Sequence, residues 1–437
     1  MNIIIAGAGK VGFNLAKSLS VGHEVTIIDK NSEALHRIEE SLDILPVNGD
    51  VEDPATYHQF LQKEIDLFIA VTNIDNVNLI STLIIDNILH VKKKFVRLQN
   101  HFYQESNIKE QLKIDKIIFP TQLASSAIAS LLHYPKANNV KFFKYTKSQL
   151  ISVRASKDIQ PIKLSRYNFV VVGIERDKEF IIPKEDIEIY PNDLVYCFGL
   201  GGDIKEACNQ LEFETTNQTN KCVVFGGGEL GISIAKSLLH ITNDVKLIEK
   251  DLEQCQNADE LLGGKVSIIN SKYGASDIFE DEGLDNADIF IAATNNDEFN
   301  IIKCLEAKDK GINKVIAINN EMEYYNLMHS LGIIVVRGPK MSAYNTIMEH
   351  IGSTGIIIQK SFCGAKANVF MRKVFASSKF INKKLKPMHT NQSNIYYLRD
   401  EKIYPFIEKV QLQENDIIVA FCSANESPTI KHWIYEL

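Results

Sequence analysis

The sequence lacks the features that mark membrane-spanning, secreted and nucleic-acid-binding proteins. None of its apolar runs approaches the roughly 18 to 20 residues that a membrane-spanning helix requires. The amino terminus has no basic region ahead of its first apolar residues, so we expect no signal peptide. Lys and Arg number 48 against 55 Asp and Glu, a net charge of −7, which leaves no basic surplus to hold a polyanion. We therefore expect a cytoplasmic protein that binds no nucleic acid.

Cysteine is present in seven copies, but its pattern fits neither a disulfide framework nor a metal site. No Cys-x-x-Cys pair occurs, and no cysteine stands at a metal-ligand spacing from histidine. The number is odd and the positions are scattered, so we expect reduced thiols and no bound metal.

The strongest feature that is present is an internal repeat. Residues 3–12, 25–30 and 66–75 return in the same order as residues 222–231, 245–250 and 288–297. Residues 190–195 likewise return within 412–419. Ordered matches of this kind indicate a duplication with small insertions.

Each repeat begins with short β-branched strands that alternate with helices. In the first repeat we expect strands at 2–6, 24–28, 44–47, 66–71, 95–98 and 117–119, and helices at 32–41 and 123–133. This alternation predicts a parallel sheet with helices on both faces. The stretch from about 140 to 211, and the tail after about 356, instead show short alternating strands and turns. We therefore predict an α/β chain with two Rossmann-like doubly wound parallel sheets, each followed by a small α+β module.

Two further segments bear on how the halves are joined. The polar stretch Thr215–Asn220 is the expected linker between them. The apolar helices after Pro120 and Pro339, the second of which contains Tyr344, are candidates for crossing onto a neighbouring unit. Ordinary packing within their own unit is the equal alternative.

The first repeat carries the pattern Gly7-x-Gly9-x-x-Gly12 directly after a predicted strand and at the start of a predicted helix. In that context the first glycine permits a tight turn, the second lets the backbone approach a pyrophosphate, and the third lets helix and strand pack closely. The amides of Gly7–Val11 and the helix dipole then face the phosphate. Asp29 ends the next strand, where a carboxylate accepts from ribose hydroxyls and repels the 2′-phosphate of NADP. The pattern favours NAD or another adenosine nucleotide over a plain glycine turn with a solvated Asp.

Other polar residues follow the neighbouring strands. Asp50 follows the third strand and could accept from the adenine amine or the ribose, and Thr72 and Asn73 end the fourth strand, on the edge where ligands bind. Arg97 lies within a short predicted strand, where a buried guanidinium needs an anion. The alternatives for that anion are a phosphate and a carboxylate partner, either Asp75 or another acid.

The second repeat keeps only part of this set. It retains Gly226, Gly228, Gly231, Glu249, Thr294, Asn295 and Asp297. Its third strand is followed by Asn270-Ser271-Lys272 rather than by Gly-Asp, and we align Arg97 with Ala317. We therefore expect the second site to bind nucleotide more weakly or with a different preference.

Two other classes of function compete with a nucleotide sensor. An NAD-dependent oxidoreductase would need an acid or base aimed at the nicotinamide, and the eleven histidines offer no motif-framed candidate. A scaffold that has lost its ligand would not need the full polar set of the first repeat. A duplicated cofactor fold with no chemistry beside it favours a sensor and not an enzyme.

These motifs and their order resemble the TrkA family, the cytosolic regulatory subunits of bacterial Trk potassium uptake systems, which carry two tandem RCK domains. The residues that carry the resemblance are Gly7–Gly12, Val47–Asp50, Ala70–Asn73, Gly226–Gly231, Leu247–Lys250, Ala293–Glu298 and, for the small module, Ile181–Pro183 with Pro191–Val195. The resemblance implies RCK-N domains over 1–134 and 219–351 and RCK-C domains over 135–216 and 352–437.

The resemblance also implies ligands and partners. With the residues argued above, the predicted binding residues are Gly7, Ala8, Gly9, Lys10, Val11, Gly12, Asp29, Asp50, Thr72, Asn73 and Arg97 in the first cleft, and Gly226, Gly227, Gly228, Glu229, Leu230, Glu249, Thr294, Asn295 and Asp297 in the second. The implied ligands are NAD(H), with ATP or ADP as alternatives. The implied partners are a membrane potassium-translocating subunit of the TrkH or TrkG kind and further copies of the chain, as a dimer or tetrameric ring. This places the protein at the inner face of the cell membrane.

Overall fold

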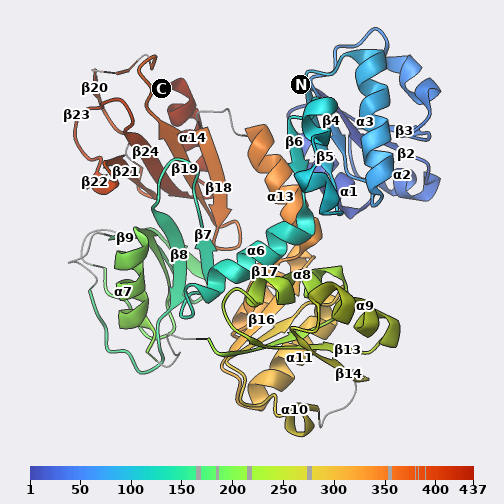
Figure 1. Cartoon of the computed structure of the whole chain (residues 1–437). Helices are drawn as coiled ribbons and strands as arrows, with labels where there is room; N and C mark the ends of the chain where they lie inside the picture. Colours follow the sequence, from blue (N-terminus) through green and yellow to red (C-terminus); the bar gives the residue numbers. More distant parts are fainter. Residues whose placement is uncertain are drawn as a thin grey trace. The chain divides into compact units, whose positions relative to one another are not determined.

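The computed structural model describes residues 1–163, 169–183, 187–213, 219–272, 278–352, 357–378, 380–381, 383–388 and 390–437. The chain divides into two compact units. Figure 1 labels the helices and strands of the whole chain. The first unit contains Met1–Ser125 and Arg337–Met348, and the second contains Ser126–Val336 and Glu349–Leu437.

The first repeat forms a six-stranded sheet in the order β3-β2-β1-β4-β5-β6, and its strand pairs are parallel. The strands are β1 (Asn2–Ala6), β2 (Glu24–Asp29), β3 (Leu45–Asn48), β4 (Leu67–Ala70), β5 (Lys93–Arg97) and β6 (Lys116–Ile118). The helices are α1 (Lys10–Leu19), α2 (Ser32–Glu39), η1 (Pro54–Phe60), α3 (Asp75–Leu89), α4 (Phe102–Glu105), α5 (Ile108–Gln111) and α6 (Pro120–Leu132). The central strands are buried on both faces, as the continuous apolar run Ile3-Ile4-Ile5 requires. The strand order reverses between β1 and β4, which is where ligands bind in such sheets.

The second repeat forms the same sheet, in the order β14-β13-β12-β15-β16-β17. Its strands are β12 (Lys221–Phe225), β13 (Asp244–Glu249), β14 (Ser267–Asn270), β15 (Ile289–Ala292), β16 (Lys314–Asn319) and β17 (Ile334–Arg337). Its helices are α8 (Glu229–Leu238), α9 (Leu252–Leu262), α10 (Ile278–Asp281), α11 (Asp297–Asp309), η2 (Met322–Tyr324), α12 (Tyr325–Ser330) and α13 (Pro339–Gly352). The predicted pair of doubly wound sheets is therefore confirmed.

The two small modules are antiparallel sheets, in the orders β10-β9-β11-β8-β7 and β18-β19-β24-β21-β22. The first contains β7 (Asn139–Lys141), β8 (Gln149–Arg154), β9 (Phe169–Arg176), β10 (Glu179–Ile181), β11 (Leu194–Gly199) and α7 (Gly201–Leu211). The second contains β18 (Ile357–Phe362), β19 (Ala367–Lys373), β20 (Lys384–Leu385), β21 (Ser393–Arg399), β22 (Lys402–Pro405), β23 (Val410–Gln411), β24 (Ile417–Ser423) and α14 (Ser427–Glu436). Both modules belong to the second unit and share one apolar core, in which the rings of Phe198 and Phe421 lie 5.3 Å apart.

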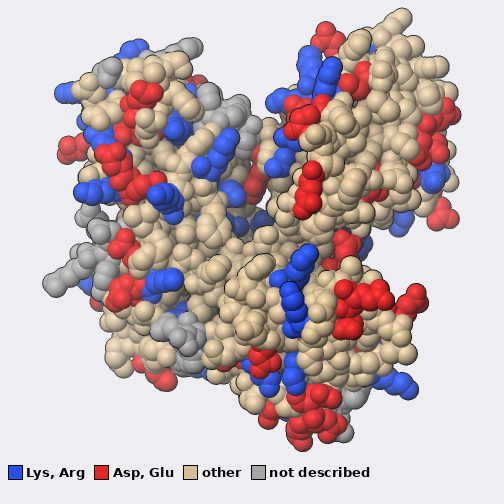
Figure 2. All heavy atoms as spheres, in the orientation of Figure 1, with Lys and Arg blue, Asp and Glu red and all other residues tan. Residues whose placement is uncertain are grey.

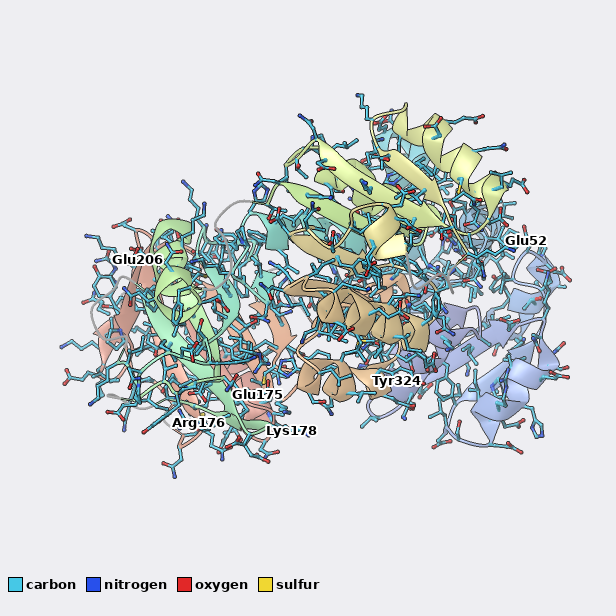
Figure 3. The ribbon with its side chains drawn as sticks, turned by 90° about the horizontal axis from the view of Figure 1, so that it is seen from below. Glu52, Glu175, Arg176, Lys178, Glu206 and Tyr324 are labelled. Carbon is cyan, nitrogen blue, oxygen red and sulfur yellow. The ribbon has the colours of Figure 1, made fainter. Side chains whose placement is uncertain are left out.

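The repeated Asn-Asp of these modules has a structural cause. Asn192 and Asn415 adopt left-handed backbone angles, with φ of 66° and 70°, which Asn tolerates better than most residues. The aspartates that follow them are clamped by arginines: Arg176 Nη2 donates to Asp193 Oδ2 at 2.7 Å, and Arg399 Nη2 donates to Asp416 Oδ2 at 2.7 Å. Figure 3 shows Arg176 close to Glu175 and Lys178 at one end of the first module.

The long helix α13 of the second repeat packs on the first repeat. Its residues from Pro339 to Met348 belong to the first unit, and the hydroxyls of Tyr344 and Ser18 lie 2.7 Å apart. The last part of α6, from Ser126, belongs to the second unit. The membership of α13 favours the crossing alternative for that helix, and the alternatives for α6 stay open. Of the predicted linker, residues 215–218 lie outside the described part of the chain, and the four predicted domain boundaries stay a prediction.

The described residues contain neither a candidate membrane span nor a disulfide. Among them, no helix combines the length and the apolar composition that crossing a membrane demands. All seven cysteines are buried and none forms a disulfide.

Candidate nucleotide-binding clefts

The first glycine loop has the geometry that close approach of a phosphate requires. Gly7 adopts a φ of 111°, which L side chains rarely adopt, and a β-carbon at Gly12 would lie 1.9 Å from Gly7 O. At Gly9 a β-carbon would meet nothing within 4 Å. No side chain caps the start of α1, so its first N–H groups and the positive end of its dipole are directed to this open position.

Asp29 holds this loop from the end of β2. Its Oδ2 accepts from Ala8 N at 2.6 Å, and its Oδ1 accepts from Asn31 N at 2.8 Å. The carboxylate is partly exposed, and each oxygen has a second lone pair beyond the one that these bonds use. Asp29 therefore braces the loop and can also accept from a ribose hydroxyl.

The turn after β4 is held by Asn78, which the sequence analysis did not single out. Asn78 is 1% exposed, and its Oδ1 accepts from the N–H and the hydroxyl of Thr72, at 2.9 and 2.7 Å. Its Nδ2 donates to Thr72 O at 3.1 Å and to Arg97 O at 2.9 Å. This one side chain therefore ties the turn at the sheet edge to β5.

Arg97 lies beneath that turn and is 8% exposed. Its Nη1 donates to Asn73 Oδ1 at 2.9 Å. The Asp75 carboxylate accepts from the backbone N–H groups of Gln99 and Asn100, at 2.8 Å each. The turn therefore combines a buried guanidinium, a side-chain amide and a carboxylate that is bound to the backbone.

The remaining predicted residues of the first cleft lie along the same edge. Lys10 begins α1 and is exposed, and Asp50 is exposed just after β3, where its Oδ1 accepts from Glu52 N at 3.0 Å. The structure thus places the predicted residues at the carboxyl ends of β1 to β5, which are neighbours around the switch in strand order. Their contacts with a ligand stay a prediction.

The second cleft repeats the framework of the first. Gly226 has a φ of 110°, and a β-carbon at Gly231 would lie 1.8 Å from Gly226 O. Asn300 accepts from Thr294 N at 3.0 Å and donates to Ile318 O at 3.0 Å, as Asn78 does for Thr72 and Arg97. Burial raises the pKa of Asp297, whose carboxylate accepts from Asn320 N and Glu321 N.

The charged residues around this second framework differ from those of the first. Glu229 begins α8 where Lys10 begins α1, and Lys272 stands where Asp50 stands after the matching strand. Among the other predicted residues, Leu230 is buried and Asn295 is exposed. An acid in the first turn of α8 repels the phosphate that Lys10 would attract.

The counterpart of Arg97 is Ile318, and the alignment with Ala317 is wrong. The sheet register pairs Ala70 with Val96 in the first repeat and Ala292 with Ala317 in the second. The residue after each pair is therefore Arg97 or Ile318, and Ile318 is fully buried. The second repeat is one residue shorter between these strands, which shifted the alignment. The second cleft lacks a guanidinium at this position, as the sequence predicts.

The second glycine of the motif has a neighbour in the second cleft that it lacks in the first. The amide oxygen of Gln254 lies 3.8 Å from the place of a β-carbon at Gly228, where the corresponding position at Gly9 is open. Among the described residues, no group of three or more His, Cys, Asp or Glu side chains could hold a metal ion. On the face shown in Figure 2, basic and acidic side chains are intermingled.

Comparisons with known proteins agree with this organisation. The Trk system potassium uptake protein TrkA of Halomonas elongata is 29% identical over 371 residues, which cover 82% of this chain and 80% of that protein. A Trk system potassium uptake protein TrkA homolog of Methanosarcina mazei is 26% identical over 452 residues, which cover 99% of this chain and all of that protein.

Solved structures share the fold. The RCK domain of GsuK matches with a TM-score of 0.61 at 15% identity, over 100% of this chain and 95% of that one. The GsuK channel bound to NAD matches with a TM-score of 0.62 at 16% identity, over 100% of this chain and 79% of that one. The TrkA-N domain family matches residues 3–120 and again residues 222–339, so the chain belongs to that family and carries its domain twice, as the resemblance predicted.

Proposed function

We propose that the protein is a regulatory subunit of a potassium uptake system, and that it senses NAD(H) or another adenine nucleotide in its first cleft. The observation that carries this proposal is the first cleft itself. An uncapped helix start at an open glycine, a partly exposed Asp29 and a buried Arg97 lie at one edge of the sheet. The relatives whose printed names are those of potassium uptake proteins support the system to which it belongs.

The polar residues at the carboxyl ends of the strands of the first sheet determine which nucleotide fits. Asp29 accepts from ribose hydroxyls and repels a 2′-phosphate, so NAD(H), ATP and ADP fit better than NADP. The GsuK channel bound to NAD and the GsuK structure bound to ADP support this class of ligand for the fold. The proposed contacts are the loop Gly7–Gly12, with Asp29, Asp50, Thr72, Asn73 and Arg97. The protein in this proposal binds its ligand and does not turn it over.

Helix α1 links the bound ligand to the second half of the chain. A phosphate at the glycine loop contacts the first turn of α1, and Ser18 in the last turn of the same helix bonds Tyr344 of α13. Because α13 comes from the second repeat, a ligand that shifts α1 also acts on the other half of the chain. A ligand changes the output only if it binds two arrangements with different affinity. We propose that this contact carries that difference.

The proposed partners are further copies of the chain and a membrane potassium-translocating subunit of the TrkH or TrkG kind. Matching positions on α3 and α11 expose large apolar side chains: Ile80 is 43% and Leu83 49% exposed, and Ile302 is 50% and Leu305 37% exposed. Exposed apolar groups repeated in both halves favour contacts between subunits. The names of the relatives support the membrane partner, which would hold the protein at the cytoplasmic face of the membrane.

Two measurements test the proposal. Thermal-shift titration with NAD, NADH, ATP and ADP should stabilise the chain, since a ligand at 100 times its Kd adds about 2.7 kcal/mol. A pull-down of membrane proteins with and without each nucleotide should recover a potassium-translocating subunit in amounts that depend on the nucleotide. No shift with any of the four nucleotides, or steady turnover of a substrate panel, would contradict the proposal.

A further inference from the structure

In each repeat, the acid that ends the second strand accepts a hydrogen bond from a residue of the glycine loop. The two repeats use different residues at both of these positions. The first repeat pairs Ala8 with Asp29, and the second pairs Gly227 with Glu249. We propose that this pair decides whether the acid can reach a ribose, so that Asp29 selects the ligand while Glu249 is an internal brace that takes no part in binding. This inference rests on the proposed function of the first cleft.

The two acids share one structural role. Asp29 Oδ2 accepts from Ala8 N at 2.6 Å, and Glu249 Oε2 accepts from Gly227 N at the same distance. Both side chains stand at the same place in their sheets, because Asp29 pairs with Asn48 as Glu249 pairs with Asn270. Each acid therefore holds the backbone N–H of the residue that follows the first glycine of its loop.

The longer acid reaches this amide only by lying closer to the loop. A β-carbon built at Gly227 would lie 2.7 Å from Glu249 Cβ and 2.9 Å from its Cγ, far inside van der Waals contact. Glycine at position 227 is what leaves room for the extra methylene. The first repeat has an alanine at this position, and its acid is the shorter one.

The consequence is a difference in exposure. Glu249 is 4% exposed, and its Oε1 is used by the N–H groups of Lys250 and Asp251, at 2.7 and 3.0 Å. Asp29 is partly exposed and accepts one backbone N–H on each oxygen. A ribose hydroxyl can therefore reach the acid in the first cleft and not in the second. The repulsion of a 2′-phosphate is lost together with the ribose contact.

Transplanting the pair tests this inference. The Ala8→Gly/Asp29→Glu variant should fold, because the second repeat already folds around the same pair. Its Kd for NAD should rise roughly ten- to a hundredfold, the loss of one hydrogen bond to a charged group. The preference for NAD over NADP, measured as the ratio of their Kd values, should fall towards one.

Two matched variants separate the pair from its members. Ala8→Gly alone keeps the exposed Asp29 and should lose less of the preference for NAD than the double variant. Asp29→Glu alone cannot fold its extra methylene beneath Ala8, so its carboxylate should stay at the cleft and the preference for NAD should fall by less than in the double variant. Circular dichroism and the unfolding midpoint check the fold of each variant.

The outcomes are distinct. A double variant that loses more of its preference for NAD than the two single variants together supports the inference. A double variant that binds NAD and rejects NADP as the unaltered chain does overturns the inference and leaves the proposed function intact, and so does an equal loss in Asp29→Glu alone. An unaltered chain that binds no nucleotide overturns the proposed function and this inference with it.

Discussion

Replacing Asn78 by alanine should separate the stability of the first cleft from that of its copy. The side chain makes four hydrogen bonds from a site that is 1% exposed. Its loss leaves the N–H, hydroxyl and carbonyl of Thr72 and the carbonyl of Arg97 without that partner. A buried polar group left unsatisfied costs about 1–3 kcal/mol, but Thr72 is partly exposed, so water replaces part of the loss. We expect a total cost of about 2–4 kcal/mol.

The second repeat supplies the matched control, because Asn300 makes the same set of bonds around Thr294 and Ile318. Asn300→Ala should cost about the same free energy of unfolding in denaturant titration. Only Asn78→Ala should weaken the tighter phase of NAD binding in calorimetry, because only that turn holds an arginine. Equal losses of NAD affinity in the two variants would refute the assignment of the ligand to the first cleft. An Asn78→Ala variant with unchanged stability would refute the structural argument.

Three further perturbations have defined outcomes. Tyr344→Phe removes the hydroxyl that bonds Ser18, so NAD should bind with the same Kd while the nucleotide dependence of a membrane pull-down disappears; a pull-down that still responds would contradict the route along α1. Burial lowers the pKa of Lys314 to about 7, below its unfolded value, so the free energy of unfolding should rise as the pH rises from about 7 to 10. Lys314→Met should flatten that rise in denaturant titrations. A rise as steep as that of the unaltered chain would contradict this prediction. Burial also lowers the pKa of His329, so the free energy of unfolding should fall as the pH drops below the pKa of the unfolded side chain, about 6.5. His329→Gln should reduce that fall between about pH 7 and 5. An undiminished fall would show that other groups cause it.

Glu175 adds to the loss of stability that is expected from His329 as the pH falls. Burial by itself would raise the pKa of Glu175, but the hydrogen bond from Lys366 and the nearby His329 lower it overall. Lys366 Nζ donates to Glu175 Oε1 at 2.6 Å and to Lys178 O at 2.6 Å, which joins the two small modules. A carboxylate with a lowered pKa loses its stabilising effect as the pH falls. The fall that remains in His329→Gln should therefore lie nearer the range of a carboxylate.

The sheets and glycine loops could be predicted because their residues serve local geometry. The run Ile3-Ile4-Ile5 has to be buried on both faces. Gly7 has a φ that L side chains rarely adopt, and a β-carbon at Gly12 would collide with the carbonyl oxygen of Gly7. The repeated Asn-Asp of the small modules was also visible, and the structure gives its cause in the left-handed Asn192 and Asn415. In each case the reason for the residue lies within a few neighbours along the chain.

The remaining features depend on contacts between distant segments. Asn78 lies within an apolar helix, and its role emerges only because β5 brings Arg97 O to its amide. The strands β7 and β18 are short or partly exposed, and each is defined by the partner strand beside it. The alignment of Arg97 failed by one residue because only the register of the sheet fixes it. The repeated Asn300 was the one signal in the sequence that could have identified Asn78.

Calorimetric titration with NADH shows whether nucleotide binds first and most tightly in the first cleft. Asp29→Ala combined with Arg97→Ala removes a ribose acceptor and the buried cation, so it should abolish the tighter of two binding phases. Glu249→Ala should leave that phase in place and remove at most the weaker one. Loss of the tight phase in Glu249→Ala, with its survival in the double variant, would contradict the account.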